Sequence, residues 1–168
     1  MYVTNWKLNL NNCHSNEKYY KNQSRSGKLA TYKTLKKSFT LENYLSVISD
    51  KEKRTTFAKI RTSNHILEIE KGRHLLKPLP AEQRICKMCN LNLVEDETHF
   101  IMVCPKFTTE RQMFLDNVQQ FIPSFKTFSI KQQFIYLFTS KEADIIMPFS
   151  NYISNIYAIR KQAGCNIP

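Results

Sequence analysis

Four residues near the middle of the chain have the types and the spacing of a metal site. Cys86 and Cys89 are separated by two residues, His99 follows after nine more, and Cys104 follows after a further four, which gives C-x2-C-x9-H-x4-C. Structural zinc sites favour four tetrahedral nitrogen and sulfur ligands, and a two-residue knuckle can turn two thiolates toward one ion. The pattern therefore predicts one structural zinc ion. Because no coordination position stays open, we expect no activation of a zinc-bound water.

Other interpretations of these residues stay open. Cys86 and Cys89 could be core or redox cysteines, although no βαβ context for a thioredoxin-type motif is visible. Further cysteines and histidines stand apart from the cluster: Cys13, His14, His65, His74 and Cys165. His65 and His74 are candidates for auxiliary ligands or phosphate contacts, but surface or packing roles are the simpler expectation for them.

The elements around the pattern must bring its two halves together. Asp96 is placed to cap a short helix that carries His99, and in such a helix His99 and Cys104 lie about one and a half turns apart. The end of this helix must then bend so that both side chains point inward. Pro105 is well placed to stop the helix at that point.

Positive charge dominates the composition. The chain has 25 lysines and arginines against 14 acids, a formal net charge of +11 and a pI near 9.5. Such a chain attracts polyanions, so nucleic acid is the leading partner class and an anionic membrane the second, while a solvated basic surface stays the alternative. The candidate phosphate contacts are the cations close to the ligands in sequence: Arg84, Lys87, Lys106 and Arg111. We expect exposed Met88 or Phe100 to touch bases.

The chain contains no stretch of roughly 20 apolar residues that would span a membrane, and its first residues lack the apolar core of a secretory signal. We therefore expect an intracellular protein of the nucleus or cytoplasm without a membrane partner. Five cysteines cannot all pair internally, and in a reducing compartment clustered cysteines hold metal more often than they form disulfides.

The patterning predicts a mainly α fold, a helical domain built around a small zinc knuckle. Residues 1–38 read as a basic, largely disordered arm that becomes helical from about Thr31, and residues 39–168 as the helical domain with the knuckle at about 84–106. An apolar stripe beyond Cys104 predicts a helix that closes over the metal site: Phe107, Phe114, Val118, Phe121 and Ile122.

Capping signals place the ends of several helices. Ser49 with Glu52, and Ser129 with Gln132, have the spacing of capping boxes. Pro148 suits the first turn of a last helix, whose aromatic stripe is expected to be core.

Several short sequence segments together resemble a known family. They are residues 59–65 (KIRTSNH), 69–73 (IEKGR), 84–86 (RIC) and 94–100 (VEDETHF), followed by Cys104-Pro105. Over roughly residues 31–121 the chain resembles the carboxy-terminal CCHC zinc region of non-LTR retrotransposon reverse transcriptases. The resemblance implies a module downstream of a polymerase domain that helps to hold template RNA or target DNA, with Cys86, Cys89, His99 and Cys104 as zinc ligands.

The chain also departs from that family. It has no Tyr/Phe-x-Asp-Asp polymerase motif, and Asp116 and Asp144 are isolated on helical patterns, without the arrangement of a restriction-like nuclease. With three glycines, it has little from which to build a phosphate cradle. We therefore expect a non-enzymatic zinc-stabilised module that binds RNA or DNA. The alternatives are a zinc-stabilised protein-interaction domain that docks a missing polymerase domain, and an element remnant without a function.

Overall fold

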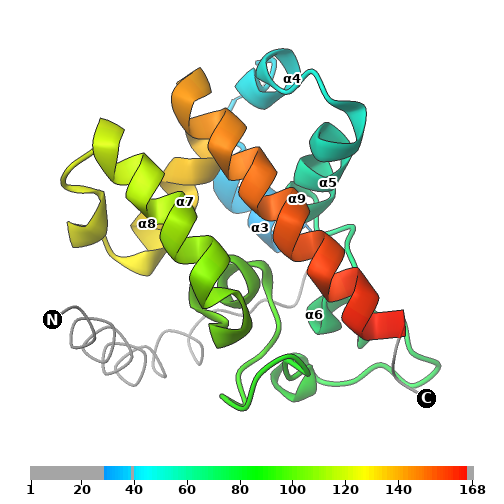
Figure 1. Ribbon diagram of the computed structural model, residues 1–168. Coiled ribbons are helices and arrows are strands. Elements are labelled where there is room, and N and C mark those ends of the chain that lie inside the picture. Colours follow the sequence, from blue (N-terminus) through cyan, green and yellow to red (C-terminus); the bar gives the residue numbers. More distant parts are fainter. Residues whose placement is uncertain (1–28, 39, 166–168) are drawn as a thin grey trace, which may run out of the picture.

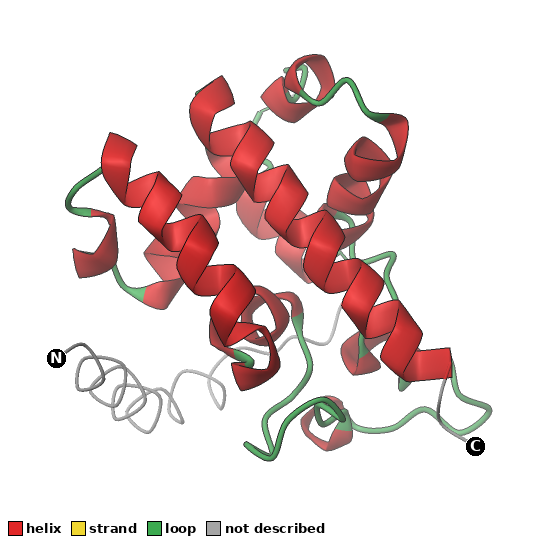
Figure 2. Ribbon diagram, in the orientation of Figure 1, coloured by secondary structure: helices red, strands yellow, loops and turns green. Residues whose placement is uncertain are grey.

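The computed structural model describes residues 29–38 and 40–165, with the side chain of Cys165 left out. The regular structure of this part is almost entirely helical, which confirms the predicted fold class (Figure 2). The helices are α3 (Ala30–Leu35), α4 (Asn43–Val47), α5 (Lys51–Arg61), α6 (Glu68–Lys71), α7 (Thr108–Phe121), α8 (Ile130–Thr139) and α9 (Ala143–Cys165). Short 3-10 turns lie at Ala81–Gln83, Pro105–Phe107 and Phe125–Thr127, and a π-helical turn at His99–Val103. Strand pairing in the described part is limited to one antiparallel bridge between Ile85 and Val94.

Helix α9 is the central helix of the domain, and α5 and α7 pack against it (Figure 1). Its buried side chains recur every three or four residues and so form one stripe along the helix. They are Ile145, Ile146, Phe149, Tyr152, Ile153, Ile156 and Tyr157. Helices α4 and α8 also contact α9, so elements from both ends of the described chain meet on this helix.

Aromatic rings fill the space between these helices. Phe149 of α9 lies 5.6 Å from Phe57 of α5 and 4.9 Å from Phe138 of α8, measured between ring centroids, in edge-to-face arrangements. Tyr152 stacks on Phe114 of α7 with centroids 4.9 Å apart. Offset stacks and edge-to-face pairs are the arrangements that aromatic rings prefer. These rings belong to the same core cluster as Cys86 and Cys104. The aromatic stripe of the last helix is core, as predicted.

The segment expected to be a basic arm is only partly described. Residues 1–28, with the candidate ligands Cys13 and His14, lie outside the described residues, as does the side chain of Cys165. The helix expected from Thr31 is α3, whose Leu35 is buried and which packs on α5 and α8. The packed domain therefore includes residues that precede position 39.

The helix ends agree with one predicted cap and correct two others. The capping box of Ser129 and Gln132 is present at the start of α8. At α5 the cap is Asp50, whose carboxylate accepts a hydrogen bond from the backbone N–H of Lys53, so the capping box predicted from Ser49 is wrong by one residue. Pro148 lies inside α9 rather than in its first turn. The helix extends back past this proline because Ile145 and Ile146 are buried.

The predicted stripe of α7 is partly confirmed. Phe107, Phe114 and Val118 are buried, whereas Phe121 is 54% exposed. No helix in the described residues is long and apolar enough to span a membrane.

Candidate metal centre

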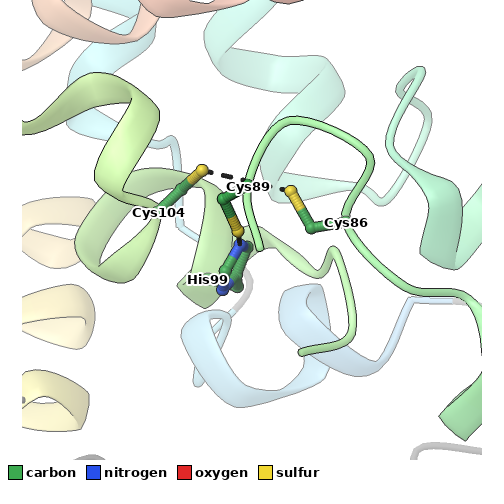
Figure 3. A group of neighbouring side chains, drawn as sticks. All are labelled: Cys86, Cys89, His99 and Cys104. Carbon is green, nitrogen blue, oxygen red and sulfur yellow. Dashed lines mark hydrogen bonds between the residues drawn. The ribbon is translucent and has the colours of Figure 1, made fainter. Parts of the chain in front are cut away.

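The four predicted ligands converge on one point in the structure (Figure 3). One ligand atom from each of Cys86, Cys89, His99 and Cys104 lies within 4.8 Å of the other three. The sulfur atoms of Cys86 and Cys104 are 4.0 Å apart, and the Cys89 sulfur is 3.5 Å from Nε2 of His99. These residues therefore lie close enough to hold a metal ion.

A short hairpin presents the two cysteines of the C-x2-C pair. The backbone N–H of Cys86 donates to the carbonyl of Leu93 at 2.9 Å, and that of Glu95 donates to the carbonyl of Arg84 at 2.9 Å. Inside the hairpin, the N–H of Met88 lies 3.4 Å from the Cys86 sulfur and turns the knuckle toward it. Asn92 takes a left-handed conformation at φ 52°, which asparagine tolerates well and which reverses the chain.

A π-helical turn presents the other two ligands. Asp96 caps it as predicted, because its carboxylate accepts a hydrogen bond of 2.7 Å from the N–H of His99. The N–H of Cys104 then donates to the carbonyl of His99 at 2.7 Å, a hydrogen bond between residues five apart. In an α-helix these two side chains would point about 140° apart. The wider turn brings them to the same side, which is the bend that the spacing required, and Pro105 follows directly in a 3-10 turn.

Burial controls the chemistry of the sulfur atoms. Cys86, His99 and Cys104 are buried and Cys89 is half-buried. The hydrogen bond with Cys104, and then burial, raise the pKa of Cys86 to about 12. Burial also raises the pKa of Cys89. Without a cation these two thiols therefore keep their protons at neutral pH, and a metal ion must displace the protons when it binds.

Two of the predicted phosphate contacts have structural roles instead. Arg84 is buried, and its guanidinium donates to the backbone carbonyls of Leu79 and Ile69. Arg111 is half-buried and donates to the carbonyls of Ile101 and Cys104, at the end of the π-helical turn. Both guanidinium groups hold the backbone around the candidate centre, so the prediction of Arg84 as a phosphate contact is corrected.

The side chains expected to touch bases are corrected in the same way. Phe100 is 1% exposed and packs edge to face against Phe107 at 5.1 Å. Met88 is half-buried and packs against the core. Lys87 and Lys106, by contrast, are exposed. Lys87 extends toward Glu68, with 3.4 Å between nitrogen and oxygen.

The two remaining described histidines lie outside the cluster. Nε2 of His65 is 3.0 Å from a carboxylate oxygen of Glu97, which also accepts a hydrogen bond from Ser63. His74 is largely exposed, with its Nε2 3.9 Å from Glu70. A packing role for His65 and a surface role for His74 are therefore what the structure shows.

Sequence reasoning missed a buried ion pair beside the centre. Arg160 of α9 is 1% exposed and binds both carboxylate oxygens of Glu95, at 2.6 and 2.9 Å. One of these oxygens lies 3.9 Å from the Cys86 sulfur. A signal existed in the sequence, because Arg160 continues the apolar stripe of Ile153, Ile156 and Tyr157 at helical spacing. A cation on a buried stripe requires an acidic partner.

The chain matches no protein-family model, no curated protein and no solved structure. The resemblance to the zinc region of retrotransposon reverse transcriptases therefore stays an expectation that rests on those short sequence segments alone.

Proposed function

We propose that this chain is a nucleic-acid-binding module whose fold around residues 84–104 is stabilised by one structural zinc ion. The observation that carries the proposal is the convergence of three sulfur atoms and one imidazole nitrogen from two separate elements. The sequence resemblance agrees with this assignment, and it suggests a module that holds RNA or DNA beside a polymerase domain.

The spacing of the donor atoms supports zinc. A tetrahedral ion with bonds of about 2.3 Å to sulfur and about 2.0 Å to nitrogen sets sulfur atoms about 3.8 Å apart and sulfur about 3.6 Å from nitrogen. Two of the six separations here are close to these values, 4.0 Å between Cys86 and Cys104 and 3.5 Å between Cys89 and His99, and all four donor atoms lie within 4.8 Å of one another. Three thiolates and one imidazole fill the four positions of such an ion, which favours a structural role over a catalytic one.

Replacing a ligand tests the zinc assignment. His99→Gln should lose the bound ion, because Gln supplies no imidazole nitrogen at that place. His65→Gln is the matched control, since His65 is also buried but binds Glu97 instead of the cluster. The measurement is metal content per chain after purification. One zinc ion in the parent and in His65→Gln, and none in His99→Gln, is the expected result, and a metal-free parent would refute the assignment.

The distribution of charge supports a polyanionic partner. Among the described residues the buried charged side chains are five acids and three arginines: Glu68, Glu70, Glu95, Asp96, Glu97, Arg61, Arg84 and Arg160. The interior therefore holds two net negative charges. The whole chain carries +11, so the residues that are not in this buried set carry +13 in total. Phosphate groups are the partner that such an excess attracts most strongly.

The exposed lysines nearest the candidate centre are the proposed phosphate contacts. Lys71 of α6 and Lys87 of the knuckle lie side by side, because both extend to Glu68, and their side chains are 44% and 61% exposed. Lys106 lies two residues after Cys104 and is also exposed. The metal would hold the backbone that carries Lys87 and Lys106 in a fixed conformation. This backbone would then need no further ordering when the two ammonium groups contact a nucleic-acid strand.

Salt dependence tests this contact set. The variant Lys71→Gln/Lys87→Gln/Lys106→Gln removes three charges, as does the control Lys51→Gln/Lys126→Gln/Lys141→Gln in exposed positions on other elements. Titration of fluorescent single-stranded RNA and DNA at several salt concentrations gives the slope of log affinity against log salt. The slope should fall by about 0.7 for each lost contact in the first variant and less in the control. Equal changes of this slope in both variants would show that the positive charges bind nucleic acid without a defined site.

A protein-interaction role is the second candidate. The aromatic side chains after Phe107 are largely buried in the chain's own core, so few of them are open to a partner. Three of the seven exposed large apolar side chains of the described part lie together between α6 and the knuckle: Leu75 at 49%, Leu76 at 101% and Leu79 at 37% exposure. Concentration-dependent self-association that Leu75→Ser/Leu76→Ser abolishes, together with weak nucleic-acid binding, would favour this second candidate.

A further inference from the structure

We infer that Arg160 is a positioning residue of the metal centre, which it controls through Glu95, and that it couples the last turns of α9 to metal affinity. The inference rests on the proposed zinc site and deepens it. Neither Arg160 nor Glu95 belongs to the ligand set.

The contacts of Arg160 form a two-sided clamp on Glu95. Its Nε donates to one carboxylate oxygen at 2.6 Å, and its terminal nitrogen donates to the other at 2.9 Å. The same terminal nitrogen donates to a carboxylate oxygen of Glu68 at 3.1 Å. Side chains of Arg160 and Glu95 are 1% and 0% exposed. Bidentate guanidinium–carboxylate pairs of this kind fix orientation as well as charge.

Glu95 lies at the junction between the two halves of the centre. Its backbone N–H closes the hairpin that carries Cys86 and Cys89, and its carbonyl accepts a hydrogen bond from the N–H of Ile69 at 3.2 Å. The next residue, Asp96, caps the turn that carries His99 and Cys104. A displacement of Glu95 would therefore shift the two cysteines of the hairpin relative to the other two ligands.

Charge gives the clamp its effect on the metal. The Glu95 oxygen that Arg160 holds at 2.6 Å is also 3.9 Å from the Cys86 sulfur. A metal-bound thiolate at Cys86 and this carboxylate would be two negative charges side by side in a buried place, and they would repel each other. Glu68 has further cations near it in Lys71 and Lys87, but among the described residues the ion pair recorded for Glu95 is with Arg160. The guanidinium therefore offsets the charge that would otherwise oppose the metal-bound thiolate.

Stability alone does not explain an arginine at this place. Buried ion pairs are often no more stabilising than apolar side chains of the same volume. The neighbouring positions of the same α9 stripe are apolar: Ile153, Ile156 and Tyr157. What distinguishes position 160 from these neighbours is that it faces Glu95 and, through it, the Cys86 sulfur.

The test compares two buried arginines in the full chain. Arg160→Met removes the cation and keeps the length of the side chain. Arg61→Met is the control, because Arg61 is also 1% exposed and bonded to a carboxylate, that of Glu42, and to the carbonyl of Phe138, away from the cysteines. The measurements are Zn²⁺ affinity by chelator competition and the absorption of the Co²⁺-loaded protein. Loss of a residue that orients a metal ligand typically lowers affinity about 10- to 100-fold. We expect that loss, with shifted Co²⁺ bands, in Arg160→Met only.

A double variant separates charge from packing. In Arg160→Met/Glu95→Gln the carboxylate is neutral, and the new amide can donate toward the Cys86 sulfur, so most of the lost affinity should return. An equal loss of affinity in Arg61→Met would overturn the positioning role, and a failure to recover in the double variant would overturn the part that charge plays in it. Should Arg160→Met not fold, Arg160→Lys, which keeps the charge and loses the bidentate contact, should show an intermediate affinity. An affinity equal to that of the parent in the folded variants would also overturn it, whereas a parent without metal would overturn the zinc assignment instead.

Discussion

At the scale of the residue, the two cysteines of the hairpin differ in their access to solvent. Cys86 is buried between Cys104 and Glu95, whereas Cys89 is half-buried and faces His99. Solvent and competing ligands therefore reach the centre most easily at Cys89. The exchange of metal between this site and a chelator should begin with that sulfur.

Metal affinity should rise with pH across the neutral range. The pKa of Cys86 is raised to about 12, and that of Cys89 is raised above its ordinary value of 9.0, so both thiols are protonated in the metal-free protein. Binding displaces these protons, and acid therefore favours the metal-free form. Calorimetric titration of Zn²⁺ at neutral pH in buffers with different ionisation enthalpies should report proton release. Heats that do not depend on the buffer would contradict the prediction.

The metal-free protein should respond to pH in the opposite direction. The folded state holds the pKa of Cys86 at about 12 against an ordinary 9.0, so the fold favours the protonated thiol. This contribution to stability is complete below pH 9 and is lost as the pH rises toward 12. Thermal melts of the chelated protein should show that loss.

The residue types predicted which four side chains converge, but not that Arg84 and Arg111, two of the four candidate phosphate contacts, bond to backbone carbonyls. Two cysteines separated by two residues are held together by the chain itself, so Cys86 and Cys89 had to lie close. The sequence does not say whether a guanidinium faces phosphate or a backbone carbonyl. Arg84 and Arg111 donate to backbone carbonyls, because the irregular backbone around the centre leaves carbonyls without helical partners.

At the scale of the element, the π-helical turn converts sequence spacing into ligand geometry. His99 and Cys104 are five residues apart, and the hydrogen bond from the N–H of Cys104 to the carbonyl of His99 spans the same five residues. This wider turn places both side chains on one side. The C-x2-C hairpin and this turn are separate elements, and they meet through Glu95 and Asp96. The centre therefore depends on two capped and closed turns rather than on one long helix.

Asp96→Ala should weaken metal binding by loosening this turn. The change removes the acceptor for the N–H of His99, and the loss of a helix cap typically costs about 1 kcal/mol of stability. Asp50→Ala, which removes the equivalent cap of α5, is the matched control and should destabilise the chain without altering its Zn²⁺ affinity. Equal affinities in the two variants would show that the cap of the π-helical turn does not position His99.

Sequence signals located the helices better than their ends. The capping box of Ser129 and Gln132 was correct: each side chain accepts a hydrogen bond from the other residue's backbone N–H, and the Ser129 hydroxyl also donates to the Gln132 side chain. Ser49 and Asp50 are adjacent capping residues, and the choice between them depends on how Ile48 is buried, which the local pattern does not state. Pro148 inside α9 is a similar case, since burial of the residues before it extends the helix.

At the scale of the whole molecule, two centres of stability lie along α9. One is the aromatic cluster of Phe57, Phe138, Phe149 and their neighbours, and the other is the candidate metal centre with Arg160. The aromatic cluster packs side chains of α5, α7, α8 and α9, none of which is a candidate metal ligand, so we expect it to persist without the metal.

Removal of the metal should therefore open the knuckle and leave the helical core folded. Hydrogen exchange after chelation should accelerate at the backbone amides of Cys86, Glu95 and Cys104 and stay slow in the middle of α5 and α9. The structural metal contributes roughly 10–16 kcal/mol in small zinc domains, where it is the main source of order. A loss of the whole helical circular dichroism signal on chelation would show the same dependence here.

The clamp also has a consequence for the order in which the protein is made. All four candidate ligands have been synthesised by residue 104, and Arg160 is added 56 residues later. At 5–20 residues per second, this interval lasts roughly 3 to 11 s. During it the thiols would be able to capture an ion while the Glu95 carboxylate beside them still lacks its guanidinium. On the proposed zinc assignment the final helix would then close over a loaded site, and metal acquisition would precede the last packing step of biosynthesis.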